Sequence, residues 1–194
     1  MKKLVDVHFT SLGQRQTLQR MQKLLALPEK VDTPGWRPTQ AKDVPRVAEL
    51  LRGYLSKFKV RAEFSEEEVA HWFLPRPGVV SSFVVDSGAA VTDFGSYYRL
   101  DSSILNNAKH PTLFAAYSFY NVPGSLSVQK LLHNLLVSAA AEGCDVFNVL
   151  DLMENRPVFE NLRFGIGDGN LHFYMYNFSV GLELKPEEIG LVLM

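Results

Sequence analysis

The spacing of apolar and polar residues along the 194-residue chain alternates between helical and strand-like periods. Apolar side chains recur every three or four residues in the helical stretches, and β-branched and aromatic residues gather in short runs in the others. Predicted strands cover 4–9, 36–39, 79–86, 91–100, 112–122, 145–152 and 171–178. Predicted helices cover 14–25, 44–58, 66–72, 128–142 and 157–162.

Local signals mark several helix ends. Asp43 is placed to cap a helix with Pro45 in its first turn, and Ser65 forms a capping box with Glu68. Gly143 suits the left-handed position that follows a helix. The helices lie in the order expected around a mixed sheet, so we predict an α/β (α+β) fold.

Residues 27–35 break all periodicity and contain two prolines and a glycine, which favours a linker. We therefore expect residues 1–30 to form a connecting strand and helix, and residues 31–194 to form the main C-terminal domain.

The composition is that of an ordinary soluble protein, with 46% apolar and 21% charged residues, and it excludes a disordered chain. A formal net charge of −1 argues against a general nucleic-acid binder. No run approaches the ~20 apolar residues of a membrane span. The one cysteine, Cys144, fits a reducing compartment, so we expect a cytoplasmic protein.

The strongest local motif is the run 163–170, in which three glycines stand at alternate positions around Asp168. It is either a plain turn before a strand, or a bend whose bare backbone lets a ligand approach while Asp168 faces a positive group such as an α-ammonium. Asn148 lies in an apolar strand and needs hydrogen-bond partners, whether structural or functional. The five histidines show no pair at helical ligand spacing, so we predict no metal site.

The end of the chain, 190–194, carries no polar side chain. If this tail is buried, desolvation raises the pKa of the Met194 carboxylate above its usual ~3.5 and makes it a proton acceptor. The alternative is a tail that pairs at a sheet edge.

The order of elements after the linker, and the opening 37–45, resemble the GNAT-type acetyltransferases. That resemblance implies a Gly-rich turn for the pyrophosphate of CoA after the central strand. Here the turn 121–127 has one glycine, and Pro123 lacks an N–H. The domain therefore resembles the acyltransferase shape without the cofactor cradle, and we expect it to hold the acceptor.

Over about residues 3–194 the sequence resembles the N-myristoyltransferases (glycylpeptide N-tetradecanoyltransferases). The run 163–169 is similar to their signature Lys-Phe-Gly-x-Gly-Asp-Gly, with Arg163 in place of Lys. Further matching stretches are 17–20, 71–73, 91–94, 115–122, 145–155 and 190–193. The family has two GNAT-like halves related by pseudo-symmetry, and this chain resembles only the C-terminal half, since the first family signature is absent.

The resemblance implies that the chain supplies most of a groove for a peptide substrate. Carried over by position, the groove residues are Tyr98, Ser102, Leu113, Tyr117, Asn148, Asp168, Gly169 and Leu171. It also implies that the Met194 carboxylate is the catalytic base. No cofactor is expected to bind tightly, and the co-substrate myristoyl-CoA is expected to bind mainly the missing N-terminal half, which also stabilises the oxyanion.

The implied reaction transfers myristate from myristoyl-CoA to the N-terminal glycine of peptides and proteins. Two departures bear on the site: Asp101 replaces the usual proline before Ser102, and Met194 replaces the more familiar terminal leucine or glutamine. Two other functions stay open, a non-catalytic module for Gly-terminated peptides and a stand-alone GNAT-like acetyltransferase. Neither nucleic acid nor a membrane span is among the expected partners.

Overall fold

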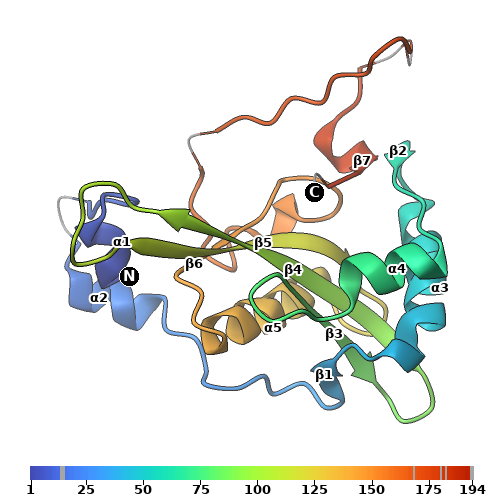
Figure 1. The fold of residues 1–194 in the computed structure, drawn as a ribbon, viewed down its shortest axis with the longest axis horizontal. Helices are drawn as coiled ribbons and strands as arrows, with labels where there is room; N and C mark the ends of the chain where they lie inside the picture. Colours follow the sequence, from blue (N-terminus) through green and yellow to red (C-terminus); the bar gives the residue numbers. More distant parts are fainter. Residues whose placement is uncertain (14–15, 168, 180, 182, 193–194) are drawn as a thin grey trace.

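A five-stranded mixed sheet organises the chain in a computed structural model that describes residues 1–13, 16–167, 169–179, 181 and 183–192. Its strand order is β1-β3-β4-β5-β6 (Figure 1). The strands are β1 (Trp36–Pro38), β3 (Val80–Asp86), β4 (Val91–Ser103), β5 (Thr112–Val122) and β6 (Val146–Asn148). Neighbours are antiparallel except β5 and β6, which run parallel because α5 (Val128–Ala141) crosses between them.

Two hydrophobic clusters lie on opposite faces of this sheet. On one face, α3 (Val44–Leu55) and α4 (Glu66–Phe73) pack with the C-terminal residues around a group of aromatic rings. On the other face, α5 covers Phe83, Tyr97 and Phe147. The alternation of side chains along the strands sends most neighbouring residues to different layers. The exception is the irregular register of β5 opposite 95–97, where Phe119 and Tyr120 both join the first cluster.

The predicted strands 36–39, 79–86, 91–100 and 112–122 are confirmed, as are the helices 44–58, 66–72 and 128–142, with ends that differ by a few residues. The capping box of α4 is confirmed, because Ser65 Oγ accepts from the Glu68 N–H at 3.2 Å and Glu68 Oε2 accepts from the Ser65 N–H at 2.8 Å. Gly143 follows α5 with φ of +81°, the left-handed conformation that glycine adopts without strain.

The predicted strand at 4–9 is wrong, because the structure has the short helix α1 (Lys2–Asp6) there. Of its apolar side chains only Leu4 is buried, and Phe9 is half exposed, so the alternation has no sheet to pack against. The following helix α2 covers Leu18–Leu24, less than the predicted 14–25, of which residues 14 and 15 lie outside the described part.

The predicted strand at 171–178 is also wrong, since the described residues of this stretch form no ladder. Tyr174, Tyr176 and Phe178 are exposed, and Phe173 alone packs partly against the core. Aromatic residues favour strands because they pack well on the face of a sheet, and among the described residues this stretch has no neighbouring strand.

Two further elements are shorter than predicted. The strand expected at 145–152 is limited to β6, which pairs only with 115–117 of β5 before the chain turns away. The helix expected at 157–162 is a 3₁₀ turn, η2 (Arg156–Val158), followed by turns. The remaining elements are the 3₁₀ turns η1 (Ala41–Asp43) and η3 (Pro186–Glu188) and a two-stranded parallel ladder of β2 (Val60–Arg61) with β7 (Ile189–Gly190).

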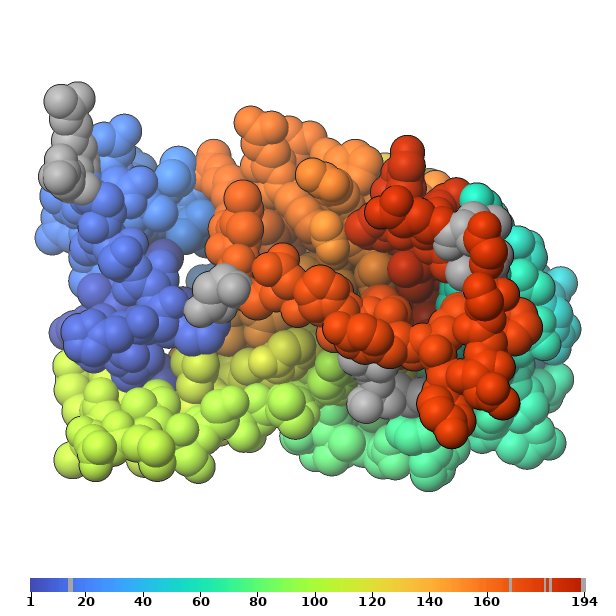
Figure 2. Space-filling view, turned by 90° about the horizontal axis from the view of Figure 1, so that it is seen from above, coloured from blue at the N-terminus to red at the C-terminus, as the bar shows by residue number. Residues whose placement is uncertain are grey.

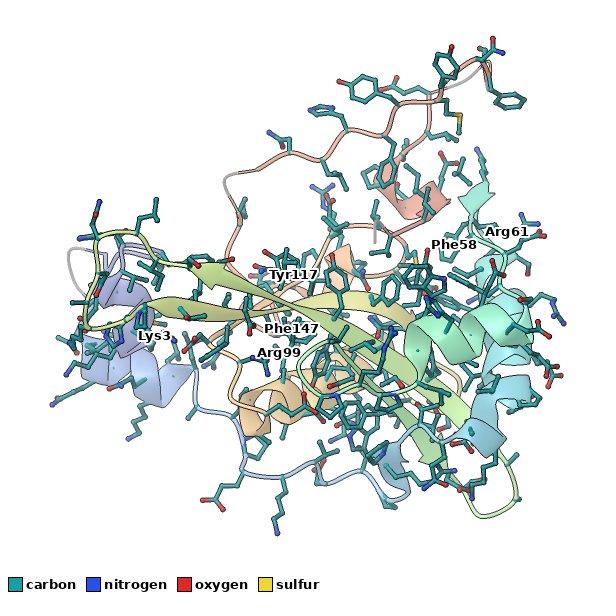
Figure 3. All side chains as sticks on the ribbon, viewed as in Figure 1. Lys3, Phe58, Arg61, Arg99, Tyr117 and Phe147 are labelled. Carbon is teal, nitrogen blue, oxygen red and sulfur yellow. The ribbon has the colours of Figure 1, made fainter. Side chains whose placement is uncertain are left out.

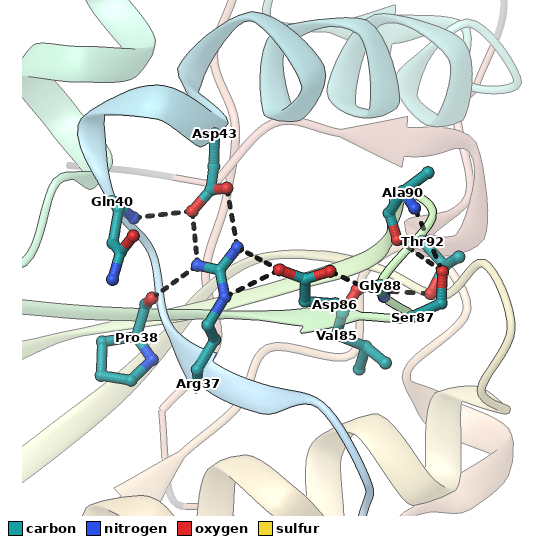
Figure 4. A network of polar contacts seen from close by, with 10 residues as sticks. All are labelled: Arg37, Pro38, Gln40, Asp43, Val85, Asp86, Ser87, Gly88, Ala90 and Thr92. Atoms are coloured by element: carbon teal, nitrogen blue, oxygen red, sulfur yellow. Dashed lines mark hydrogen bonds and ion pairs between the residues drawn. The ribbon is translucent and has the colours of Figure 1, made fainter.

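The edge strand β1 is held by a charged network (Figure 4). Arg37 donates to both oxygens of Asp43, at 2.7 and 2.9 Å, and to Asp86 at 2.8 Å. Asp43 stands at the N-cap of α3 as predicted, but its side chain makes no cap bond to that helix; it accepts instead from Arg37 and from the Gln40 N–H. The guanidinium of Arg37 lowers the pKa of Asp43 below its usual value.

In the part of the chain that the structure describes, none of the helices has the length and apolar character needed to span a membrane.

Candidate functional site

A row of three polar side chains crosses the middle of the sheet. Tyr98 on β4 stands opposite Tyr117 on β5, which in turn stands opposite Asn148 on β6. The two tyrosine rings are stacked, with centroids 5.4 Å apart and planes 10° from parallel. All three side chains are half-buried, so their polar ends remain accessible to a ligand.

These residues share the face of the sheet that is opposite α5. Tyr97 and Phe147, one residue before Tyr98 and Asn148, pack with α5, so the row points to the other side. Figure 3 shows Tyr117 on the side of the C-terminal segment and Phe147 below the strands. Asn148 therefore lies on the same face of the sheet as Tyr117 and Tyr98.

Two more predicted groove residues continue this face toward the end of the β4–β5 hairpin. Ser102 stands opposite Leu113, four residues along each strand from the tyrosine pair. Because side chains alternate between faces, both lie on the same face as the tyrosines. Leu113 is buried and Ser102 is exposed. Five of the predicted residues therefore line one surface, although Asn148 stands 46 positions after Ser102 in the sequence.

The described part of the C-terminal tail is both paired and buried, the two alternatives that the sequence left open. β7 pairs with β2, and Phe58 packs over Gly190 so closely that an added Cβ there would lie 2.7 Å from its ring. Val192 is 4% exposed, and its N–H donates to the Tyr120 hydroxyl at 3.1 Å. Burial raises the pKa of Tyr120, so this hydroxyl stays protonated at neutral pH.

Contacting rings connect the polar row to this tail. The centroid of Tyr98 lies 5.5 Å from that of Phe119, and Phe119 lies 4.9 Å from Tyr120. Tyr120 in turn holds Val192. The row and Val192 are thus connected through one layer of packed aromatic side chains.

The glycine run lies on a segment between η2 and β7, whose orange-to-red residues cross the face of the molecule seen in Figure 2. Gly169 and Leu171 are exposed, and nothing lies within 4 Å of a Cβ built at Gly165, Gly167 or Gly169. Gly165 and Gly167 do not adopt a left-handed φ. The structure therefore does not bring Gly169 and Leu171 into contact with the polar row, and Asp168 and Met194 lie outside the described residues.

Sequence reasoning missed one buried acid. Asp93 is fully buried and its carboxylate occupies the turn between β5 and α5, the turn that the sequence compared with a phosphate cradle. No local pattern marks it, because its partners lie about 30 residues away along the chain.

Within the described residues, no three His, Cys, Asp or Glu side chains gather as metal ligands.

Comparison with known proteins gives one family. The family model described as "Myristoyl-CoA:protein N-myristoyltransferase, C-terminal domain" matches residues 6–192. The chain is 49% identical over 195 residues to glycylpeptide N-tetradecanoyltransferase 1 of Arabidopsis thaliana, covering 100% of this chain and 45% of that protein. It is 47% identical over 193 residues to glycylpeptide N-tetradecanoyltransferase 2 of Danio rerio, covering 99% and 39%. The chain thus spans less than half the length of these relatives.

Solved structures match the same family and also show the fold. An N-myristoyltransferase of Saccharomyces cerevisiae with bound myristoyl-CoA matches with a TM-score of 0.82 and 31% identity, over 87% of this chain and 46% of that one. An acetyltransferase with acetyl-CoA from Clostridium acetobutylicum matches with a TM-score of 0.55 and 14% identity, over 72% and 94%. The second likeness concerns the fold alone, an α/β GNAT-like fold as the sequence predicted.

Proposed function

Because the chain belongs to the N-myristoyltransferase family, as its C-terminal domain, we propose that it is the peptide-binding part of a glycylpeptide N-tetradecanoyltransferase. The whole protein would transfer myristate from myristoyl-CoA to the N-terminal glycine of a peptide or protein. This chain receives the acceptor, on the face that carries the polar row Tyr98, Tyr117 and Asn148.

The chemistry needs a neutral amine at the right place. An α-amino group has a pKa of ~7.7–8.0 and is mostly protonated at neutral pH, so a base must remove a proton. The amine nitrogen then attacks the thioester carbonyl and the new C–N bond forms. As the C–S bond breaks, the nitrogen loses its second proton, which neutralises the departing thiolate, so CoA leaves as the thiol. In the proposal the Met194 carboxylate accepts the proton, and Asp168 faces the ammonium group before it is lost.

Each remaining groove residue receives a simple role. Asn148 supplies an amide that can both donate to and accept from a peptide backbone. The stacked tyrosines form a flat wall with accessible hydroxyls, and Leu113 an apolar floor. Gly169, which has open space around it, lets the peptide come close to the chain.

The observation that carries this proposal is the packed connection between the polar row and Val192. Peptide-binding groups and the proposed base must be held in fixed relative positions, because proton transfer needs heavy atoms within hydrogen-bond reach. The rings of Phe119 and Tyr120 link Tyr98 with Val192, two residues before the proposed base.

Acyl-CoA and oxyanion stabilisation are assigned to the rest of the longer protein. This chain spans less than half of its relatives, and the turn that would cradle phosphates is filled by Asp93. A yeast relative of known structure carries bound myristoyl-CoA, which supports that thioester as the co-substrate.

Calorimetric titration of the chain with a Gly-initiated peptide tests the acceptor role. We expect saturable binding that Asn148→Ala weakens about tenfold, the effect of losing one or two hydrogen bonds. Asn161→Ala is the matched control, because Asn161 is exposed and, among the described residues, its side chain bonds only to Gln129. A peptide with an acetylated N-terminus should bind more weakly than the free one.

Equal peptide affinities of the Asn148→Ala and Asn161→Ala variants would contradict the assignment of Asn148 to the peptide groove.

The role of the terminal carboxylate as the base needs a second experiment. The same titration and an acyl-transfer assay of the whole protein are repeated with an amidated C-terminus. We expect transfer to fall by at least about 10²-fold, the usual contribution of a general base, while peptide binding is retained. Unchanged transfer would exclude the terminal carboxylate as the base.

A further inference from the structure

The turn between β5 and α5 aims three consecutive backbone N–H groups at a single side chain. The N–H groups of Gly124 and Leu126 donate to Asp93 Oδ1 at 2.7 and 2.8 Å. The Ser125 N–H and hydroxyl donate to Oδ2 at 3.1 and 2.5 Å, and the Thr92 hydroxyl donates to Oδ2 at 2.7 Å. Both carboxylate oxygens therefore accept at least two hydrogen bonds.

This arrangement has the physical features of a phosphate-binding turn. It stands at the carboxyl end of a sheet strand and directly before a 14-residue helix, α5, whose dipole and free N–H groups favour an anion. Ligands of open α/β sheets bind outside the carboxyl ends of strands, and consecutive N–H groups form anion-binding concavities.

Asp93 takes the place of the anion in this turn. Its side chain is fully buried, yet the ion pairs of the described residues do not include it, so peptide and hydroxyl groups alone stabilise its charge. Burial raises the pKa of Asp93, but the hydrogen bonds from the turn outweigh this effect and hold the pKa below its usual value. The carboxylate therefore stays ionised inside the protein at neutral pH.

The turn is also closed against the sheet. A Cβ at Gly124 would lie 1.9 Å from the Thr92 carbonyl oxygen, so the backbone of the turn touches the backbone of β4. Only glycine fits this approach. The contact leaves no room for a diphosphate between the turn and the strand.

We propose that Asp93 is a built-in substitute for a phosphate group, which fills the anion-binding turn 123–127 and prevents phosphate-bearing ligands from binding there. Asp93 thereby determines the ligand specificity of this turn. Although the fold is GNAT-like, the domain does not bind acyl-CoA at the turn after its central strand. This role depends only on the contacts of Asp93 and is independent of the acyl transfer proposed above.

Amide NMR of the whole chain tests this role with formate and inorganic phosphate as probes. In the wild-type protein neither anion should shift the N–H signals of Gly124, Ser125 and Leu126. Asp93→Ala removes the carboxylate, and formate should then shift these three signals in a saturable way and raise the unfolding temperature. Asp101→Ala is the matched control, because Asp101 is an exposed carboxylate on the same strand.

Formate is expected to bind Asp93→Ala at least about tenfold more tightly than phosphate, since it matches the lost carboxylate in size. A folded Asp93→Ala variant without any saturable shift would show that the turn is not an anion site. Saturable shifts of the same signals in the wild-type protein on adding phosphate or acetyl-CoA would overturn the exclusion, and the latter would revive a stand-alone acetyltransferase.

A second variant keeps the test decisive if Asp93→Ala does not fold. Asp93→Asn has the size of the original side chain but no charge. We expect a lower unfolding temperature than for the wild type and faster hydrogen exchange of the Gly124 and Leu126 amides, with no anion binding because the amide still fills the turn. An unchanged unfolding temperature and unchanged exchange would contradict the charge-based role.

Discussion

The strand β5 and the segment 171–178 are both rich in aromatic residues, yet only one of them is a strand. Each contains four Phe or Tyr residues. β5 lies between β4 and β6, and both of its faces are covered by packed side chains. The segment 171–178 has no neighbouring strand among the described residues, and most of its large side chains are exposed. An aromatic run thus favours a strand, but it forms one only where a neighbouring strand pairs with it.

The largest difference should come from comparing an aromatic residue of α4 that packs against β5 with an aromatic residue of the segment 171–178. Phe73 is fully buried, with its ring within about 6 Å of those of Phe94, Phe119 and Tyr120. Phe73→Ala should lower the free energy of unfolding by about 3–5 kcal/mol, because it leaves a cavity. Tyr176 is 97% exposed, and Tyr176→Ala should change the free energy of unfolding by less than about 0.5 kcal/mol.

Urea unfolding monitored by circular dichroism measures both variants. If Tyr176→Ala also lost several kcal/mol, the segment 171–178 would be packed in solution and the contrast with β5 would not hold.

The edge strand β1 sharpens the comparison, because its three residues form a ladder that the longer segment does not. We attribute this difference to Arg37, which ties β1 to Asp43 and Asp86. Arg37→Ala should cost about 2 kcal/mol, since it leaves the buried Asp43 carboxylate without its cation.

The pH dependence of unfolding reports the same interaction. The pKa of Asp43 is lowered in the folded state, so its contribution is complete above the unfolded pKa of ~3.9 and is lost as pH falls through the lower folded value. The wild type should therefore lose more stability than Arg37→Ala in this acidic range. Parallel curves for the two proteins would show that Arg37 does not stabilise Asp43.

The smallest of these effects comes from two glycines of the C-terminal region. Gly190 lies under Phe58, and Gly190→Ala should cost about 1–2 kcal/mol because the ring must move. Gly169 has open space around it, and Gly169→Ala should change the free energy of unfolding by less than about 0.5 kcal/mol. Thermal unfolding of the two variants compares them directly, and equal losses would mean that the tail and the glycine run are packed alike.

Much of the fold follows from the sequence, because local signals and burial agree there. Ser65 with Glu68 and Gly143 mark helix ends through contacts within a few residues, and the apolar periodicity of α3 and α5 marks the faces that pack on the sheet. The predicted family membership is likewise confirmed by the comparisons. The roles of the groove residues and of Met194 stay predictions.

What only the tertiary structure decided depends on groups far apart in the chain. The sequence could identify Tyr98, Tyr117 and Asn148 as candidates, but strand register placed them in one row. It could show that the turn 123–127 is poor in glycine, but only folding brings Asp93 into that turn, and the strand predicted at 171–178 finds no partner. Periodicity and capping are local properties, whereas burial of a charge and pairing of a strand depend on what the rest of the chain places beside them.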